Sequence, residues 1–330
     1  MRKLACFLVF ALIAATACAA PPSTSHHGAA TAATTAATTT TATSKNHFIV
    51  GSLHVQRYGR LGRPLILIPG LGSGAWVWKG ALAHLRQNHV VYTVTLAGFD
   101  GTQPPSKKTG LMKQAQASLL TLIKSQHIDH PVLVGHSLGG TLALAFATQH
   151  SDLLAGVVAV DGLPIFPGMQ TMTTAQRKAA AERMRAQMAK ATPAQFKAQQ
   201  LQYMQHIGVI DAAKARQYAA MQARSDPATT AQFMYEDLVA DGRAGLKNIH
   251  VPVLEISPYN APDFENAAKA SKRPTISAEQ KADYYRQLLD GVAQLQVVSI
   301  APSRHFVMID RPLRFQSVLD NFMSALPSKP

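Results

Sequence analysis

The sequence predicts an α/β fold, a mostly parallel β-sheet with helices on both faces and a helical insertion. Two observations lead to this prediction. Short apolar, β-branched runs alternate along the chain with segments whose apolar residues recur at helical spacing. One long stretch without a strand, residues 164–246, interrupts that alternation. Regular alternation is typical of parallel sheets, because the crossover between two parallel strands is usually a helix.

The expected elements follow in chain order. Residues 47–58 are expected to form an extended pair with a turn at Gly51-Ser52, and 64–69 form an apolar run that suits a strand buried on both faces. Further strands are expected at 89–96, 131–135, 155–160, 251–257 and 294–300, and helices at 111–126, 141–150, 277–289 and after Pro312.

The insertion is rich in Ala, Gln, Met, Lys and Arg, so it is expected to be helical. Seven of the eleven methionines lie in it: Met169, Met172, Met184, Met188, Met204, Met221 and Met234. Methionine fills gaps between loosely packed helices, and it also lines adaptable apolar pockets. Both interpretations remain open at this point.

The first residues have the pattern of a bacterial export signal. A positive start is followed by an apolar stretch, residues 4–15, which is too short for a stable membrane span. We expect a signal peptide over 1–19 and an Ala/Thr-rich linker over 20–46. A second interpretation takes 15–18 as a lipobox, in which Cys18 carries lipid and tethers the protein to a membrane. The chain is therefore expected in the periplasm, anchored to the outer membrane or outside the cell.

Composition excludes several classes. Of 330 residues, 47% are hydrophobic and 15% charged, which does not fit a disordered chain. Two cysteines, Cys6 and Cys18, are too few for a disulfide scaffold. The net charge of +14 could suggest nucleic acid, but the basic residues are dispersed and no nucleic-acid motif is present. We therefore expect no nucleic-acid partner.

The strongest motif is Gly135-His136-Ser137-Leu138-Gly139, between a predicted buried strand and a predicted helix. This G-x-S-x-G pattern is a nucleophile elbow, a sharp turn that exposes the serine hydroxyl and needs small flanking residues. Ser137 is therefore the candidate nucleophile.

A glycine-rich loop, 69–74, follows the 64–69 run. Such a loop can direct a backbone N–H at an adduct on Ser137, and we expect the amides of Leu71 and Leu138 to form an oxyanion hole. A phosphate-binding loop is disfavoured, because no Lys-Ser/Thr follows Gly74 and no G-x-G-x-x-G spacing occurs.

His305 is the candidate general base, because it follows the last predicted strand and precedes the final helix. A loop there can place an imidazole over the carboxyl edge of the sheet, beside Ser137. The pairs 26–27 and 127/130 lack a third ligand in view, so no metal and no cofactor is expected.

These motifs resemble those of the α/β-hydrolase superfamily, over roughly residues 47–326. The matching pieces are 69–72, 96–99, the Ser137 elbow, and His305-Phe306 before Asp310-Arg311-Pro312. The resemblance implies a core of 47–163 and 247–330, with 164–246 as the helical cap.

The candidate acid departs from the family pattern. The resemblance implies a carboxylate after the strand that follows the cap, where the sequence has Ala261, and Asp263 lies two residues late. The alternative is Asp161, at the end of the strand before the cap, where some family members carry their acid. An aspartate there can also simply cap a turn. Both candidates remain open, with Asp161 preferred.

The expected function is a serine hydrolase that cleaves a small carboxylic ester through an acyl-enzyme on Ser137. A lactonase, amidase or aminopeptidase of the same fold is the alternative, and a non-catalytic ligand-binding protein is an alternative of another class. The expected partner is a small acyl substrate; the sequence leaves the oligomeric state open.

Overall fold

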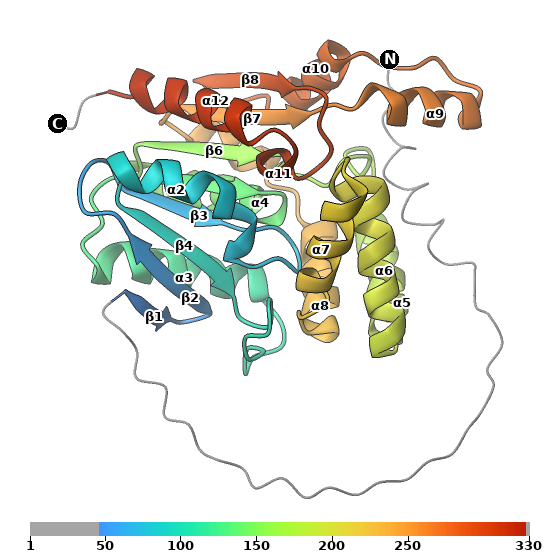
Figure 1. Ribbon diagram of the computed structural model, residues 1–330, viewed down its shortest axis with the longest axis horizontal. Coiled ribbons are helices and arrows are strands. Elements are labelled where there is room, and N and C mark those ends of the chain that lie inside the picture. Colours follow the sequence, from blue (N-terminus) through green and yellow to red (C-terminus); the bar gives the residue numbers. More distant parts are fainter. Residues whose placement is uncertain (1–45, 328–330) are drawn as a thin grey trace, which may run out of the picture.

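The computed structural model describes residues 46–327, so the predicted signal peptide, Cys18 and nearly all of the predicted linker lie outside the described residues. Eight strands form one sheet (Figure 1). They are β1 (His47–Val50), β2 (Leu53–Tyr58), β3 (Leu65–Ile68), β4 (Val91–Leu96), β5 (Val132–His136), β6 (Gly156–Val160), β7 (Val253–Pro258) and β8 (Leu295–Ile300).

The spatial order of the strands is β1-β2-β4-β3-β5-β6-β7-β8. Strands β3 to β8 are mutually parallel, and β2 runs antiparallel to both β1 and β4. The predicted fold class is confirmed. Because the strands are parallel, the loops that follow β3, β5, β6, β7 and β8 all leave at one edge of the sheet.

Side chains alternate between two cores, one on each face of the sheet. In β3, Leu65 and Leu67 pack in one cluster, whereas Ile66 and Ile68 pack in the other. The first cluster includes residues of α2 (Lys79–Asn88), α11 (Val307–Asp310) and α12 (Pro312–Ala325), and the second those of α3 (Leu111–Ser125), α4 (Leu138–His150) and α10 (Ala278–Leu288). All four β3 side chains are fully buried, which explains the unbroken apolar run.

Four helices connect β6 to β7 and lie together beyond the edge where the parallel strands end (Figure 1). They are α5 (Thr174–Ala189), α6 (Pro193–Tyr203), α7 (Ala212–Gln222) and α8 (Pro227–Val239), and a π-helical turn η4 (Met204–Gly208) follows α6. Below, "the cap" means α5 to α8 with η4. Thr173 and Thr192 begin α5 and α6 with capping boxes, in which each threonine accepts from the third amide of its helix.

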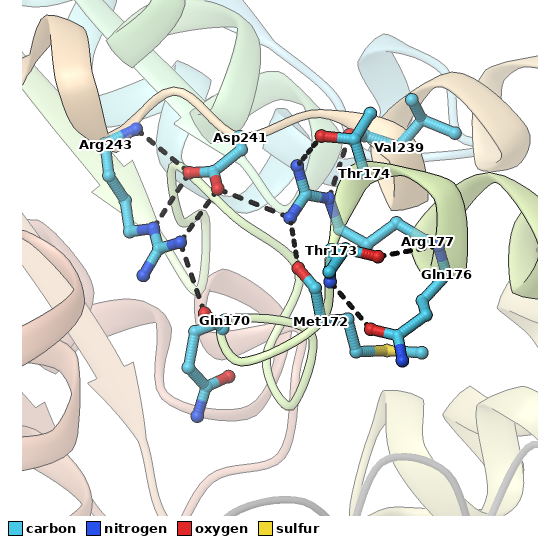
Figure 2. Close-up of polar contacts among 9 residues, drawn as sticks. All are labelled: Gln170, Met172, Thr173, Thr174, Gln176, Arg177, Val239, Asp241 and Arg243. Carbon is cyan, nitrogen blue, oxygen red and sulfur yellow. Dashed lines mark hydrogen bonds and ion pairs between the residues drawn. The ribbon is translucent and has the colours of Figure 1, made fainter.

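The two ends of this insertion are joined by ionic contacts (Figure 2). Asp241, which follows α8, accepts from Arg243 Nε at 2.8 Å and lies 3.5 Å from Arg177 Nη1 of α5. Arg177 is only 6% exposed and also donates to the carbonyls of Met172 and Val239. These bonds tie the start of α5 to the chain that returns from α8 to the core.

The observed elements differ from the predicted ones in the start of one helix, in two unpredicted helices and in several short helical turns. Helix α4 begins at Leu138, directly after Ser137, and not at 141, because the two glycines that weakened the helical pattern, Gly139 and Gly140, lie inside it. Helices α2 and α9 (Ala261–Ser271) were not predicted. Short helical turns, also not predicted, are η2 (Ala75–Trp78), η3 (Ser151–Leu153), η5 (Arg243–Asn248) and α11. No helix within residues 46–327 combines the length and apolar character that a membrane span requires.

Candidate active site

Ser137 lies on the turn between β5 and α4 with a strained backbone, φ 53° and ψ −122°. Its flanking glycines leave no room for a side chain. A Cβ on Gly135 would lie 2.1 Å from the carbonyl oxygen of Gly139, and one on Gly139 would lie 2.3 Å from that of Ile68. The predicted elbow geometry is therefore present, and its strain is held by close packing against β3.

Backbone contacts bring three chain segments to one point at the carboxyl edge of the sheet. The Ser137 amide donates to the carbonyl of Val160 at 2.9 Å, which places the elbow beside the end of β6. Asp161 follows Val160 and has φ 52°. The ring of His136 lies 4.5 Å from that of His305, and its Nε2 is 3.1 Å from the His305 carbonyl oxygen. Ser137, Asp161 and His305 thus converge from distant positions in the chain.

The structure separates the two candidate acids. His305 Nδ1 lies 2.5 Å from Asp161 Oδ2, and both side chains are 14% exposed. Asp263 instead accepts two hydrogen bonds from Arg304, at 2.7 and 2.8 Å, and one from Asn260. Asp263 lies in the first turn of α9, so it is on a helix rather than in a loop that could reach His305.

Two side chains that sequence reasoning missed hold the other oxygen of Asp161. The Tyr285 hydroxyl donates to Oδ1, and Lys281 Nζ lies 3.8 Å from it while donating to the carbonyl of Pro258 at 2.6 Å. Lys281 and Tyr285 are four residues apart, on one face of α10. Burial alone would raise the pKa of Asp161, but the charge of Lys281 and the contacts with His305 and Tyr285 outweigh it and lower this pKa.

Two further titratable groups are fully buried beneath the site. His136 Nε2 donates to the His305 carbonyl, and burial lowers the pKa of this ring well below the usual value, so the ring is neutral. Burial likewise raises the pKa of Glu255, on β7, well above its usual value. Both Glu255 oxygens and His136 Nδ1 lack a well-formed hydrogen bond within the described residues. Neither residue has a sequence signal of its own, because Glu255 lies inside a predicted strand and His136 occupies a variable position of the elbow motif.

The glycine-rich loop lies against the elbow, as expected. A Cβ on Gly70 would lie 3.1 Å from the Cβ of Ser137. Leu138 is the first residue of α4, so its amide belongs to the free first turn of that helix directly after Ser137, and Leu71 follows Gly70 in the loop. The cap holds this loop: Gln222 Nε2 donates to the Leu71 carbonyl at 3.0 Å, and the Ser225 hydroxyl to that of Gly72 at 2.8 Å.

Aromatic rings from core and cap surround His305. Trp76 stacks on Tyr218 of α7 with ring centroids 5.2 Å apart, and on Phe306 at 6.2 Å. Tyr203 of α6 meets the rings of His305 and Phe306 edge-on, at 6.2 and 6.4 Å. The surroundings of the site are therefore largely apolar and are shared between core and cap.

Two other features lie apart from this site. A hollow of about 490 Å³ between α3, α4 and α8 has none of Ser137, Asp161 or His305 in its lining. Within residues 46–327, no group of three or more His, Cys, Asp or Glu side chains is arranged to hold a metal ion.

The model of the alpha/beta hydrolase family matches residues 65–316, most of the chain. Together with the fold and the elbow, this match shows that the chain belongs to the alpha/beta hydrolase family and is an enzyme of that class. Solved structures share the fold at low sequence identity. An enol-lactonase from Burkholderia xenovorans LB400 is 20% identical, with a TM-score of 0.60 over 82% of this chain and 96% of the other. A hydrolase from Pseudomonas aeruginosa PA01 is 17% identical, with a TM-score of 0.67 over 85% and 99%.

Curated relatives match over a shorter stretch. A (lyso)-N-acylphosphatidylethanolamine lipase from Bos taurus is 29% identical over 109 residues, 32% of each chain. A 2-hydroxy-6-oxo-2,4-heptadienoate hydrolase from Pseudomonas putida is 31% identical over 130 residues, 36% of this chain and 47% of the relative. The first of these matches spans about a third of the relative's length.

Proposed function

We propose that this protein is a serine hydrolase that cleaves small carboxylic esters through an acyl-enzyme on Ser137. The observation that carries the proposal is the contact of His305 Nδ1 with Asp161 Oδ2 at 2.5 Å, beside a serine on a strained elbow. A nucleophile, a base and a group that orients the base are the three parts that acyl transfer requires.

The order of steps follows from these positions. Asp161 is ionised and accepts from the Nδ1–H of His305, which leaves Nε2 free to take the proton of Ser137 as its oxygen attacks the ester carbonyl. The amides of Leu71 and Leu138 stabilise the negative oxygen that forms. His305 then returns the proton to the leaving alcohol, and a water molecule, activated by the same imidazole, releases the acid.

We propose that the substrate carries an apolar group of modest size. The aromatic rings of Trp76, Tyr203, Tyr218 and Phe306 support this proposal, because they offer apolar surface next to His305. A series of p-nitrophenyl esters of increasing chain length measures the preference. A kcat/KM maximum among short acyl chains is expected, and a rise that continues to long chains would contradict it.

We further propose that the protein is exported to the bacterial envelope and that a lipid on Cys18 tethers it there. The charged start, the apolar run and the lipobox-like residues 15–18 support this. Metabolic labelling with an alkyne fatty acid should mark the wild-type chain. Equal labelling of Cys18→Ala would refute the tether.

A fluorophosphonate probe tests the hydrolase itself. Such a probe reacts with an activated serine, so it should modify the folded wild-type protein once, on the peptide that contains Ser137. Ser137→Ala should remain unlabelled, and Ser118→Ala, which changes a buried serine of α3, is the matched control that should still react. Absence of labelling in folded wild-type protein would refute the proposal.

A further inference from the structure

Three arginines gather around a surface hollow at the opposite end of the molecule from Ser137. The hollow, of about 550 Å³, is lined by Arg57, Arg60 and Arg86, with Asn46 and Tyr58 beside them. No acidic residue lines it. Within the described part of the chain, Arg57, Arg60 and Arg86 form no ion pair with a carboxylate, because the arginines that do so are other residues.

A leucine stands out from the same surface. Leu61 follows Arg60 in the loop between β2 and β3, and it is 76% exposed, although exposing a leucine side chain to water costs free energy. Below, "the arginine patch" means Arg57, Arg60 and Arg86 together with Leu61. A large apolar side chain flanked by arginines is a pattern that suits the boundary between lipid headgroups and acyl chains.

The loop that presents Leu61 is held in place. Gly59 and Gly62 have φ of +71° and +81°, and a Cβ on either would lie within about 2 Å of a carbonyl oxygen at the end of α2. The ring of His89 also contacts the carbonyl of Arg63, 3.1 Å from Nδ1. A tightly packed turn therefore holds the Leu61 side chain in solvent, so Leu61 can contact a partner surface without rearrangement of the loop.

The arginine patch lies on the side of the sheet opposite Ser137 and next to the start of the described chain. Tyr58 pairs with Val91, the first residue of β4, so the patch lies at the amino edge of the parallel strands, whereas Ser137 follows the carboxyl end of β5. Asn46, where the described chain starts, lines the hollow, and its carbonyl accepts from the amide of Arg57 at 2.8 Å. The 45 residues before it contain the proposed lipid site, Cys18.

We propose that the arginine patch docks the protein on an anionic lipid bilayer, with the arginines on headgroup phosphates and Leu61 in the interface. The patch is where a tether from Cys18 joins the folded part, so tether and patch would act on the same surface. Docking in this way leaves the Ser137 edge facing the aqueous side. The shared orientation of tether and patch rests on the proposed lipid at Cys18, whereas binding of the patch to a bilayer depends neither on that lipid nor on the hydrolase activity at Ser137.

Vesicle partitioning tests this proposal. The full chain carries Cys18→Ser in every sample, which removes acylation there, and binding is compared between phosphatidylcholine vesicles and an equimolar mixture with phosphatidylglycerol. The ratio of the two partition coefficients isolates the electrostatic part of binding. The leader, with Arg2 and Lys3, is the same in every sample, so its contribution to the ratio cancels when a variant is compared with the parent chain. The test variant is Arg57→Gln/Arg60→Gln/Arg86→Gln, and Leu61→Ser is measured separately.

The matched control removes the same charge from the cap, with Lys178→Gln/Arg183→Gln/Lys190→Gln, three exposed positions on or directly after α5. Each patch arginine should contribute roughly 5-fold, so the triple variant should lose on the order of 100-fold in the ratio. Leu61→Ser should lower the partition coefficient on anionic vesicles roughly 5-fold. The ratio for the control variant should stay within about 3-fold of that for the parent chain.

Thermal unfolding establishes that each variant is folded before binding is compared. Equal losses in the patch and control variants would overturn the proposal, because net charge alone would then account for binding. A parent chain that does not prefer the anionic vesicles would also overturn it. The proposal would likewise be overturned if the patch variant bound a random DNA duplex more weakly than the parent chain but bound vesicles equally well.

Discussion

Tyr285 donates a hydrogen bond to one oxygen of Asp161 while His305 contacts the other. The carboxylate is thereby fixed between two elements, α10 on one side and the loop after β8 on the other. Burial raises the pKa of the Tyr285 hydroxyl well above its usual value, so this group stays a donor throughout the range of an activity assay. In the proposed mechanism, Tyr285 is thus a positioning residue that acts through Asp161 on the imidazole of His305.

We expect Tyr285→Phe to lower kcat about 10-fold with little change in KM, because a hydrogen bond to a charged group is removed and the ester itself is not touched. Tyr284→Phe is the matched control. The Tyr284 hydroxyl interacts with Gly168 and Gln170 rather than Asp161, so kcat should hardly change. Equal effects of the two substitutions on kcat would argue against a specific role of Tyr285. Steady-state kinetics on a p-nitrophenyl ester measures both.

Asp241→Ala should destabilise the protein by about 3 kcal/mol, because it leaves the buried guanidinium of Arg177 without its carboxylate (Figure 2). Glu182→Ala removes the partner of Arg185, whose side chain is 41% exposed, and should cost less than about 1 kcal/mol. Urea denaturation followed by circular dichroism gives both values. A loss in Asp241→Ala no larger than in Glu182→Ala would contradict the importance of this contact.

Asp237, on α8, should make stability depend on pH. Burial raises its pKa to about 7, although a hydrogen bond with Thr141 opposes the shift. Between the ordinary value of 3.8 and about 7, the folded state keeps a proton that the unfolded state has released, so stability falls as pH rises through this window.

The variant Asp237→Asn carries no ionisable group at this position and should lose that dependence. Relative to wild type, it should be more stable at the upper end of the window than at the lower end, by about 1 to 3 kcal/mol. Unfolding midpoints measured at several pH values test this expectation. Wild-type and variant curves that run parallel would show that Asp237 ionises in the folded protein as it does in the unfolded chain.

The features that the sequence predicted are those with a local signal. The strands were predictable because burial on both faces produces unbroken apolar runs such as 65–68. The elbow was predictable because Ser137 needs two glycines at fixed spacing, where any side chain would clash with backbone. The helix α9 was missed because none of its side chains is fully buried, so it lacks an apolar face to detect.

The surroundings of Asp161 were not predictable in the same way. Lys281 and Tyr285 reach Asp161 only because α10 packs beside the ends of β6 and β7. No sequence motif or residue spacing indicates that these two side chains contact Asp161. The choice between the two aspartates depended on the same tertiary information. Arg304 pairs with Asp263 and His305 with Asp161, although the two partners are adjacent in the chain.

The measurement that tests the proposed mechanism most directly compares kcat for Asp161→Asn and Asp263→Asn on one ester. Asp161→Asn should lower kcat by roughly 10³- to 10⁴-fold, because His305 loses the acceptor that selects its tautomer. Asp263→Asn should lower kcat less than about 10-fold, because it weakens contacts with Arg304 and Asn260 but none with His305. The reverse order, or small losses in both variants, would contradict a catalytic set of Ser137, His305 and Asp161.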